Sequence, residues 1–130
     1  MNGRLGSVLF TVAGAVLVAI ALYNAWNTYG FVRSATRAGG TVAALNAGGS
    51  HPQIAFQTET GEAISYPQGG LIFGMKPGDA VTVLYRADNP RATATIDAAG
   101  ALWFSTALTG GLGAALLLAG TLWGRKALGG

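Results

Sequence analysis

The sequence has no cysteine and a single histidine, and charged residues make up only 10% of its 130 positions. Without cysteine there is no disulfide bridge, no thiolate metal site and no thiol nucleophile. The lone His51, in a glycine-rich segment, lacks the second histidine or cysteine that a zinc site normally needs, and we interpret it as a solvated loop residue. The basic residues are scattered rather than clustered, which argues against nucleic-acid binding. We therefore expect no metal, no cofactor and no nucleic-acid partner.

Signatures of catalysis are also missing. No serine lies in a Gly-x-Ser-x-Gly setting, and the glycine pairs lack the Lys-Ser/Thr ending of a phosphate-binding loop. Glu59 and Glu62 flank Gly61 in an expected tight turn, where carboxylates are usually solvated rather than paired as a general acid and base. The sequence therefore predicts that the protein is not an enzyme, and no catalytic residue is assigned.

Two long uncharged runs stand out in what remains. The first extends from Leu5 to Val32, and we expect a membrane span over Leu5–Trp26. The second extends from Ala98 to Gly124. A helix needs roughly 20 apolar residues to cross a bilayer, and helices buried in soluble proteins rarely run this long without charge. A cleaved signal peptide is the alternative for the first run, although its apolar region is usually shorter. The sequence thus predicts a two-pass membrane protein.

Aromatic residues near the ends of these runs fit the interface belts of membrane proteins. Trp103 and Trp123 would be about 30 Å apart in a helix that rises about 1.5 Å per residue, which is close to the thickness of the hydrocarbon core. Tyr23 and Trp26 lie where the first span would leave the bilayer. We expect these aromatic residues to be membrane-interface anchors.

The distribution of charge bears on orientation. The terminal segments carry Arg4, Arg125 and Lys126 with no acidic residue, whereas all five acidic residues lie between the two runs. Positive charge close to a span favours the cytoplasm, although Arg33 and Arg37 argue for the opposite orientation. We expect the termini to be cytoplasmic at the inner membrane of a bacterium, with the central domain in the periplasm or outside the cell.

The segment between the runs alternates apolar and polar residues with period two, which is typical of strands. In "QIAFQT", for example, Ile54 and Phe56 share one face. Turn signals rich in glycine and proline separate five expected strands, at residues 41–45, 53–58, 62–66, 80–86 and 92–96. We expect a membrane α+β protein in which two transmembrane helices flank a small antiparallel β-barrel or curled sheet. Residues 1–32 would form a cytoplasmic tip and the first transmembrane helix, residues 33–97 the β domain outside the membrane, and residues 98–130 the second transmembrane helix and a cytoplasmic tail.

The order of these segments resembles a known family. A membrane helix is followed by "GTVAAL", "PQIAFQTETGE" and "KPGDAVTVLYRADNPRATATI", and then by a closing membrane helix. This arrangement is similar to the bacterial two-pass membrane proteins of domain-of-unknown-function family 3592, and the most specific element is Gly78 to Pro90. The sequence departs from the pattern at Arg86-Ala87, where a more turn-like residue is expected. The resemblance implies the architecture and no catalytic residues.

Two features are candidates for contact with partners. The stretch "LIFGM" contains Leu71, Ile72, Phe73 and Met75 and forms either a core strand or plug at the mouth of the barrel, or a loop that rests on the membrane or on a partner. The expected spans also carry small residues at a spacing of four, as in the pairs Gly110 with Ala114 and Gly120 with Gly124. Such residues let helices approach closely in lipid, either within this chain or with another protein.

Two functional hypotheses remain. In the first, the protein is a structural or accessory subunit of a larger membrane complex and contacts the bilayer and other membrane protein subunits, with self-association as a variant. In the second, it is a stand-alone binding protein, for instance an immunity factor that blocks a toxin in the periplasm.

Overall fold

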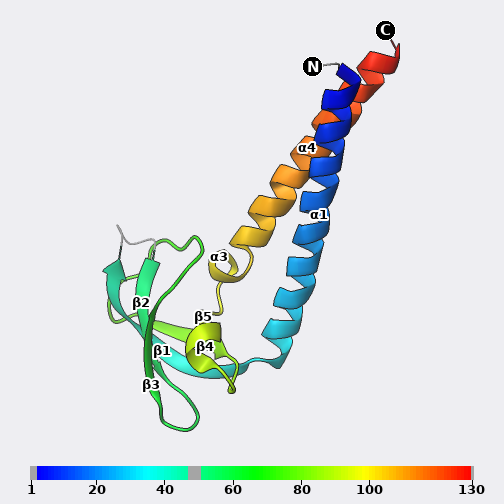
Figure 1. The fold of residues 1–130 in the computed structure, drawn as a ribbon. Helices are drawn as coiled ribbons and strands as arrows, with labels where there is room; N and C mark the ends of the chain where they lie inside the picture. The colour runs from blue at the N-terminus through cyan, green and yellow to red at the C-terminus, as the bar shows by residue number, and fades with distance from the viewer. Residues whose placement is uncertain (1–2, 47–50, 130) are drawn as a thin grey trace. The chain divides into compact units, whose positions relative to one another are not determined.

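The structure is a computed structural model that describes residues 3–46 and 51–129, and it consists of two compact units (Figure 1). One unit contains the chain up to Asn27 together with the segment from Ser105 onwards. The other contains Thr28–Phe104. The elements are α1 (Gly3–Ser34), β1 (Thr36–Asn46), β2 (His51–Gln57), β3 (Ala63–Pro67), β4 (Ala80–Tyr85), α2 (Pro90–Thr93), β5 (Thr95–Ile96), α3 (Ala99–Leu102) and α4 (Phe104–Gly129).

The two long helices, α1 and α4, are long and apolar enough to cross a membrane by length and composition. The expectation that the second apolar run forms one helix from residue 98 is wrong, because α3 ends at Leu102 and α4 begins only at Phe104. The carbonyl of Gly100 accepts the backbone N–H of Leu71 at 3.0 Å. This carbonyl therefore bonds outside the helix, and the helical hydrogen-bond ladder does not continue through it.

Helices α1 and α4 pack with their backbones in direct contact (Figure 1). A Cβ atom on Gly14 would lie 2.7 Å from the carbonyl oxygen of Gly113, and one on Gly113 would lie 2.8 Å from the amide nitrogen of Val18. The buried hydroxyl of Ser7 donates a hydrogen bond of 2.7 Å to the carbonyl of Gly120. The absence of side chains at these glycines is therefore what allows the two helices to meet this closely.

The small residues singled out in the sequence divide between two faces of α4. Gly120 and Gly124 contact α1, because a Cβ atom on Gly124 would lie 2.6 Å from the Ser7 hydroxyl and one on Gly120 would lie 2.6 Å from the amide nitrogen of Thr11. Gly110 approaches Ala21, with 3.3 Å between the Cβ it would carry and the Cβ of Ala21. Ala114, in contrast, is exposed.

The strands form one antiparallel sheet in the order β3-β2-β1-β4-β5. Strand β1 is the central strand of this sheet. Its first half pairs with β4 and its second half pairs with β2. It carries an irregularity between Val42 and Ala44, and such bulges increase the bend and twist of a strand. The result is a curled half-barrel.

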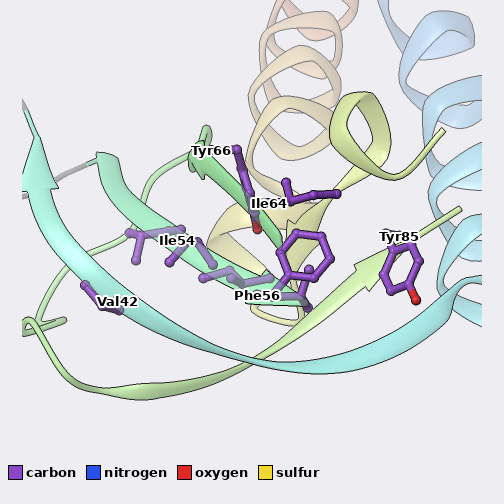
Figure 2. Packing of buried hydrophobic residues seen from close by; sticks show 9 residues of the cluster. Val42, Ile54, Phe56, Ile64, Tyr66 and Tyr85 are labelled. Atoms are coloured by element: carbon purple, nitrogen blue, oxygen red, sulfur yellow. The ribbon is translucent and has the colours of Figure 1, made fainter. Parts of the chain in front are cut away.

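The core lies on the inner face of this curl (Figure 2). The predicted alternation is confirmed, because Ile54 and Phe56 of β2 are buried and Gln57 is exposed. Phe56 packs edge-on against Tyr66, with 6.0 Å between ring centroids, and tilted against Tyr85 at 5.4 Å. Gly40 is buried in the same core, where a Cβ would lie 3.3 Å from the Cβ of Phe56 and still closer to Val83. Glycine thus makes room for the aromatic core.

The half-barrel is closed by a side chain rather than by strand pairing. Gln68, which is 4% exposed, follows β3 and reaches β5. Its Oε1 accepts hydrogen bonds from the Ile96 amide at 2.9 Å and from the Tyr66 hydroxyl at 2.8 Å, and its Nε2 donates to Thr95 Oγ1 at 3.1 Å. Nearby, the Arg91 guanidinium donates to the carbonyl of Ser65 at 3.2 Å. These bonds join the first and last strands of the sheet.

Four sequence expectations need correction here. Of the strand expected at 92–96, only Thr95–Ile96 forms a strand, β5. Residues 92 and 93 belong to helix α2, because Pro90 occupies its first turn and the Thr93 hydroxyl donates to the Asn89 carbonyl at 2.7 Å. His51 begins strand β2 instead of lying in a loop, although it is exposed. Strand β1 begins at Thr36, earlier than the expected start at residue 41. The "LIFGM" stretch is not a strand. The turn expected at Ala47 to Ser50 lies outside the described residues.

Two glycines of α4 offer a matched test of the helix contact. Gly111 has no atom within 4 Å of its missing Cβ, whereas Gly113 faces the backbone of α1. Gly111→Ala should raise stability by up to about 1 kcal/mol through helix propensity. Gly113→Ala should lose this gain and lower the Tm, because its methyl group forces the helices apart. Thermal unfolding in mild detergent measures the difference, and equal Tm values for the two variants would contradict the contact.

Replacing Gln68 tests the closure of the sheet. Gln68→Leu leaves the Ile96 amide without its partner in the buried interior and should destabilise the β unit by about 1–3 kcal/mol. Gln57→Leu is the control, since Gln57 is exposed. Urea unfolding followed by near-ultraviolet circular dichroism measures both variants. A Gln68→Leu protein as stable as Gln57→Leu would show that the closure contributes nothing.

Candidate functional site

A groove crosses the face of the sheet opposite the core, and we call it the sheet groove. Its volume is about 510 Å³. Successive side chains of a strand point to opposite faces, and residues that alternate with the buried core residues, such as Thr41 and Ala55, line the groove together with core residues such as Phe56. Strands β1, β2, β3 and β4 all contribute: Gly39, Gly40, Thr41, Ala55, Phe56, Gln57, Ala63, Ile64, Ser65, Ala80 and Val81.

The lining of the sheet groove is small and uncharged. Paired strands place Ala55 of β2 beside Thr41 of β1 on one side and beside Ser65 of β3 on the other. Short side chains leave the floor shallow and the main chain accessible, and there is no carboxylate, amine or imidazole among them to act in acid–base chemistry. The groove is therefore suited to contact with an apolar or main-chain surface rather than to catalysis.

Polar side chains at one end of the sheet groove are tied to one another. Gln53 donates to the Ser65 hydroxyl at 2.7 Å and accepts from the Asn46 amide at 3.1 Å. This ladder runs across β1, β2 and β3 and fixes the side chains in place. A partner would meet a surface with little conformational entropy left to lose.

A second recess, of about 270 Å³, is acidic. Glu59, Glu62 and Asp88 border it together with Tyr85. The backbone amide of Glu59 donates to the Tyr85 hydroxyl at 3.0 Å, and the three acidic residues are exposed. In the part of the chain that the structure describes, no group of three or more histidine, cysteine, aspartate or glutamate residues could hold a metal ion. The hairpin turn has the form expected from the sequence, with Gly61 at φ 87°.

The buried Tyr66 is a structural hydrogen-bond donor. Burial raises the pKa of its hydroxyl above the usual value of 10.0, because the charged phenolate would lose its hydration. The hydroxyl therefore stays protonated at neutral pH and donates to Gln68 Oε1 at 2.8 Å. It serves the closure of the sheet and offers no acid or base at a surface.

The "LIFGM" residues separate into two groups. Ile72 is 6% exposed and belongs to the core, and Met75 packs against it. Leu71 and Phe73 point away, with 42% and 73% of their surfaces exposed. Ile72 thus fills the half-barrel, as one alternative expected. Its neighbours Leu71 and Phe73 form an exposed apolar tip, as a surface loop would.

The aromatic residues expected at membrane interfaces lie in different settings. Tyr23 and Trp26 of α1 are exposed, at 68% and 76%. Trp103 is partly buried at the end of α3. Trp123 packs on α1, where its ring lies 5.6 Å from that of Phe10 and leaves no room for a side chain on Gly6. Trp123 is therefore part of the helix contact.

Sequence reasoning missed the sheet groove and the role of Gln68. Gln68 looked like a turn residue between Pro67 and two glycines, and a lone glutamine carries no signal for a bond to a strand 28 residues away. The groove had a weak signal, namely alanine, glycine and serine at the solvent-facing positions of three strands. Those positions usually carry larger polar side chains in a sheet with one wet face.

Comparisons with known proteins give one clear relationship. The chain is similar to the immune protein Tsi4 of Pseudomonas aeruginosa, with 50% identity over 114 residues, which are 88% of this chain and 79% of that protein. No family model matches the chain, so the resemblance to domain-of-unknown-function family 3592 stays a prediction. No solved structure matches it. At this identity and coverage, the chain belongs to the family of the immune protein Tsi4.

Proposed function

We propose that this protein is an immunity protein that binds a protein toxin and so protects the cell that makes it. The observation that carries the proposal is the 50% identity to an immune protein over 88% of the chain. It supports the second of the two hypotheses drawn from the sequence. Nothing in the comparisons supports the first, an accessory subunit of a membrane complex.

The proposal includes a binding mode without catalysis. An immunity protein of this kind acts by occupying its target, and affinity then comes from shape and apolar contact at a preorganised surface. We assign the toxin contact to the sheet groove. Its support is the uncharged lining, the accessible main chain and the fixed polar ladder at one end. An apolar or extended segment of the toxin would fit such a lining.

The proposal also includes the membrane. Helices α1 and α4 expose large apolar side chains along their length, among them Val12, Val16, Leu112 and Leu118. Such side chains are unfavourable in water and favourable in lipid. We propose that both helices span the inner membrane, with the termini in the cytoplasm and the β unit in the periplasm. A toxin that acts at this membrane would then meet its inhibitor there.

The sheet groove can be tested by introducing bulk and charge. Deleting the gene should make the bacterium sensitive to its own parent strain in mixed culture, and restoring the wild-type gene should reverse this. Ala63→Arg places a long cation in the groove and should weaken toxin binding at least about tenfold, a loss of about 1.4 kcal/mol. Survival in competition with the parent strain is the measurement.

The matched control is Ala92→Arg. Ala92 is exposed on α2 and does not line the sheet groove. The Ala92→Arg variant should protect the bacterium as well as the wild type does. Equal survival of the deletion strain and its parent would contradict the immunity function, whereas full protection by Ala63→Arg would contradict only the assignment of the groove.

The proposed topology can be read by labelling, since the chain has no cysteine of its own. Thr60→Cys lies in the exposed β2–β3 turn and should react with a membrane-impermeant maleimide once the outer membrane is permeabilised. Lys126→Cys, at an exposed position near the end of α4, should react only after the inner membrane is broken. The reverse pattern would place the β unit in the cytoplasm.

A further inference from the structure

We infer that the apolar tip formed by Leu71 and Phe73 is an anchor that inserts into the lipid surface beside α4. This inference rests on the proposed function in one respect, namely that α4 spans the membrane. It adds a second, non-helical contact between the β unit and the bilayer. The occupant of the tip is therefore lipid rather than protein.

The conformation of the local backbone exposes the tip. Ile72 is buried in the core, and its two neighbours along the chain therefore point outwards. Gly74, at φ 80°, turns the chain immediately after Phe73. The chain then returns to the core at Met75, which packs against it. Phe73 is 73% exposed, a large apolar surface to leave in water on a small domain.

The tip is fastened to α3 by its backbone. The Leu71 amide donates to the Gly100 carbonyl at 3.0 Å. Neither Gly70 nor Gly100 has room for a side chain, because a Cβ on Gly70 would collide with the Gly100 carbonyl oxygen and one on Gly100 with the Leu71 carbonyl oxygen. Gly70 also adopts φ 87°, which other residues rarely do. The tip is therefore held against α3, which Figure 1 labels, by a hydrogen bond and close backbone packing within the β unit.

The short link between Gly100 and the start of α4 limits how far the tip can lie from the first turn of that helix. Helix α3 ends at Leu102 and α4 begins at Phe104. Four residues separate Gly100 from Phe104, and even a fully extended chain covers at most about 14 Å over that length. If α4 enters the bilayer from its first turn, the tip therefore lies within reach of the interface, where apolar groups insert about 5–10 Å.

Charge is arranged to permit this insertion. No charged residue occurs from Gly69 to Met75. Asp97, which precedes α3, is paired with Arg37 at 2.8 Å, so its charge is compensated. Lys76 follows the tip with an exposed side chain, and a cation at that place favours anionic lipid headgroups. Asp79 faces back to the chain, where its carboxylate accepts the Lys76 amide at 2.9 Å.

The test measures depth in lipid on the full-length protein. Leu71→Cys carries an environment-sensitive fluorophore in nanodiscs of zwitterionic and anionic phosphatidyl lipids, with a nitroxide placed just below the headgroups. We expect the nitroxide to quench this label. Phe73→Glu in the same protein should lower the quenching at least about twofold, because a carboxylate resists insertion. Since Phe73 is exposed, the variant should fold normally.

Two reporters serve as controls. Thr60→Cys, in the exposed β2–β3 turn, should not be quenched. Ala115→Cys, exposed near the middle of α4, should be quenched by a nitroxide deep in the acyl chains. An unquenched Leu71 label beside a quenched Ala115 label would overturn the anchor while leaving the span intact. An unquenched Ala115 label would overturn the proposed span itself. A Leu71 label that is shielded from water but not quenched by lipid would point to a protein partner and overturn the inference.

Discussion

The β unit depends on the hydrogen bonds of one buried side chain, Gln68. A five-stranded sheet that does not close leaves two edges, and unpaired edges are costly when buried and prone to aggregation when exposed. Gln68 satisfies the Ile96 amide at one edge while it extends from the end of β3 at the other. The Tyr66 hydroxyl donates a second hydrogen bond to the Oε1 atom that accepts the Ile96 amide. The curl of the sheet brings its two edges near each other, and these hydrogen bonds hold them together around the aromatic core.

Helices α1 and α4 associate through a different kind of contact from the one that closes the sheet. Where helices span a membrane, as we propose for α1 and α4, apolar side chains gain nothing by meeting each other, and two helices associate through close packing and interhelical polar contacts. Gly14, Gly113 and the Ser7 hydroxyl supply both along α1 and α4. The β unit thus relies on side-chain hydrogen bonds in a core, whereas the helical unit combines missing side chains at glycines with one buried hydroxyl and the packing of Trp123.

The sequence was informative wherever a pattern is local. Alternation over residues 53–58 placed Ile54 and Phe56 in the core, and the turn around Gly61 formed as expected. It failed where partners are distant. The expected strand begins at residue 41, whereas β1 begins at Thr36 and includes Gly40, whose missing side chain leaves room for Val83 and Phe56. The sheet groove depends on which strands are neighbours, and the bond from Gln68 to β5 joins residues that only the fold brings together.

The narrow contact between α1 and α4 has a consequence for how this family can change over evolutionary time. Only the positions whose side chains would enter the contact, such as Gly14, Gly113 and Gly120, restrict substitution there, and most of the circumference of both helices faces outwards. The outward positions are free to exchange one apolar residue for another. Divergence among relatives should therefore concentrate on the outer helix surfaces, while the contact positions remain glycine, alanine or serine.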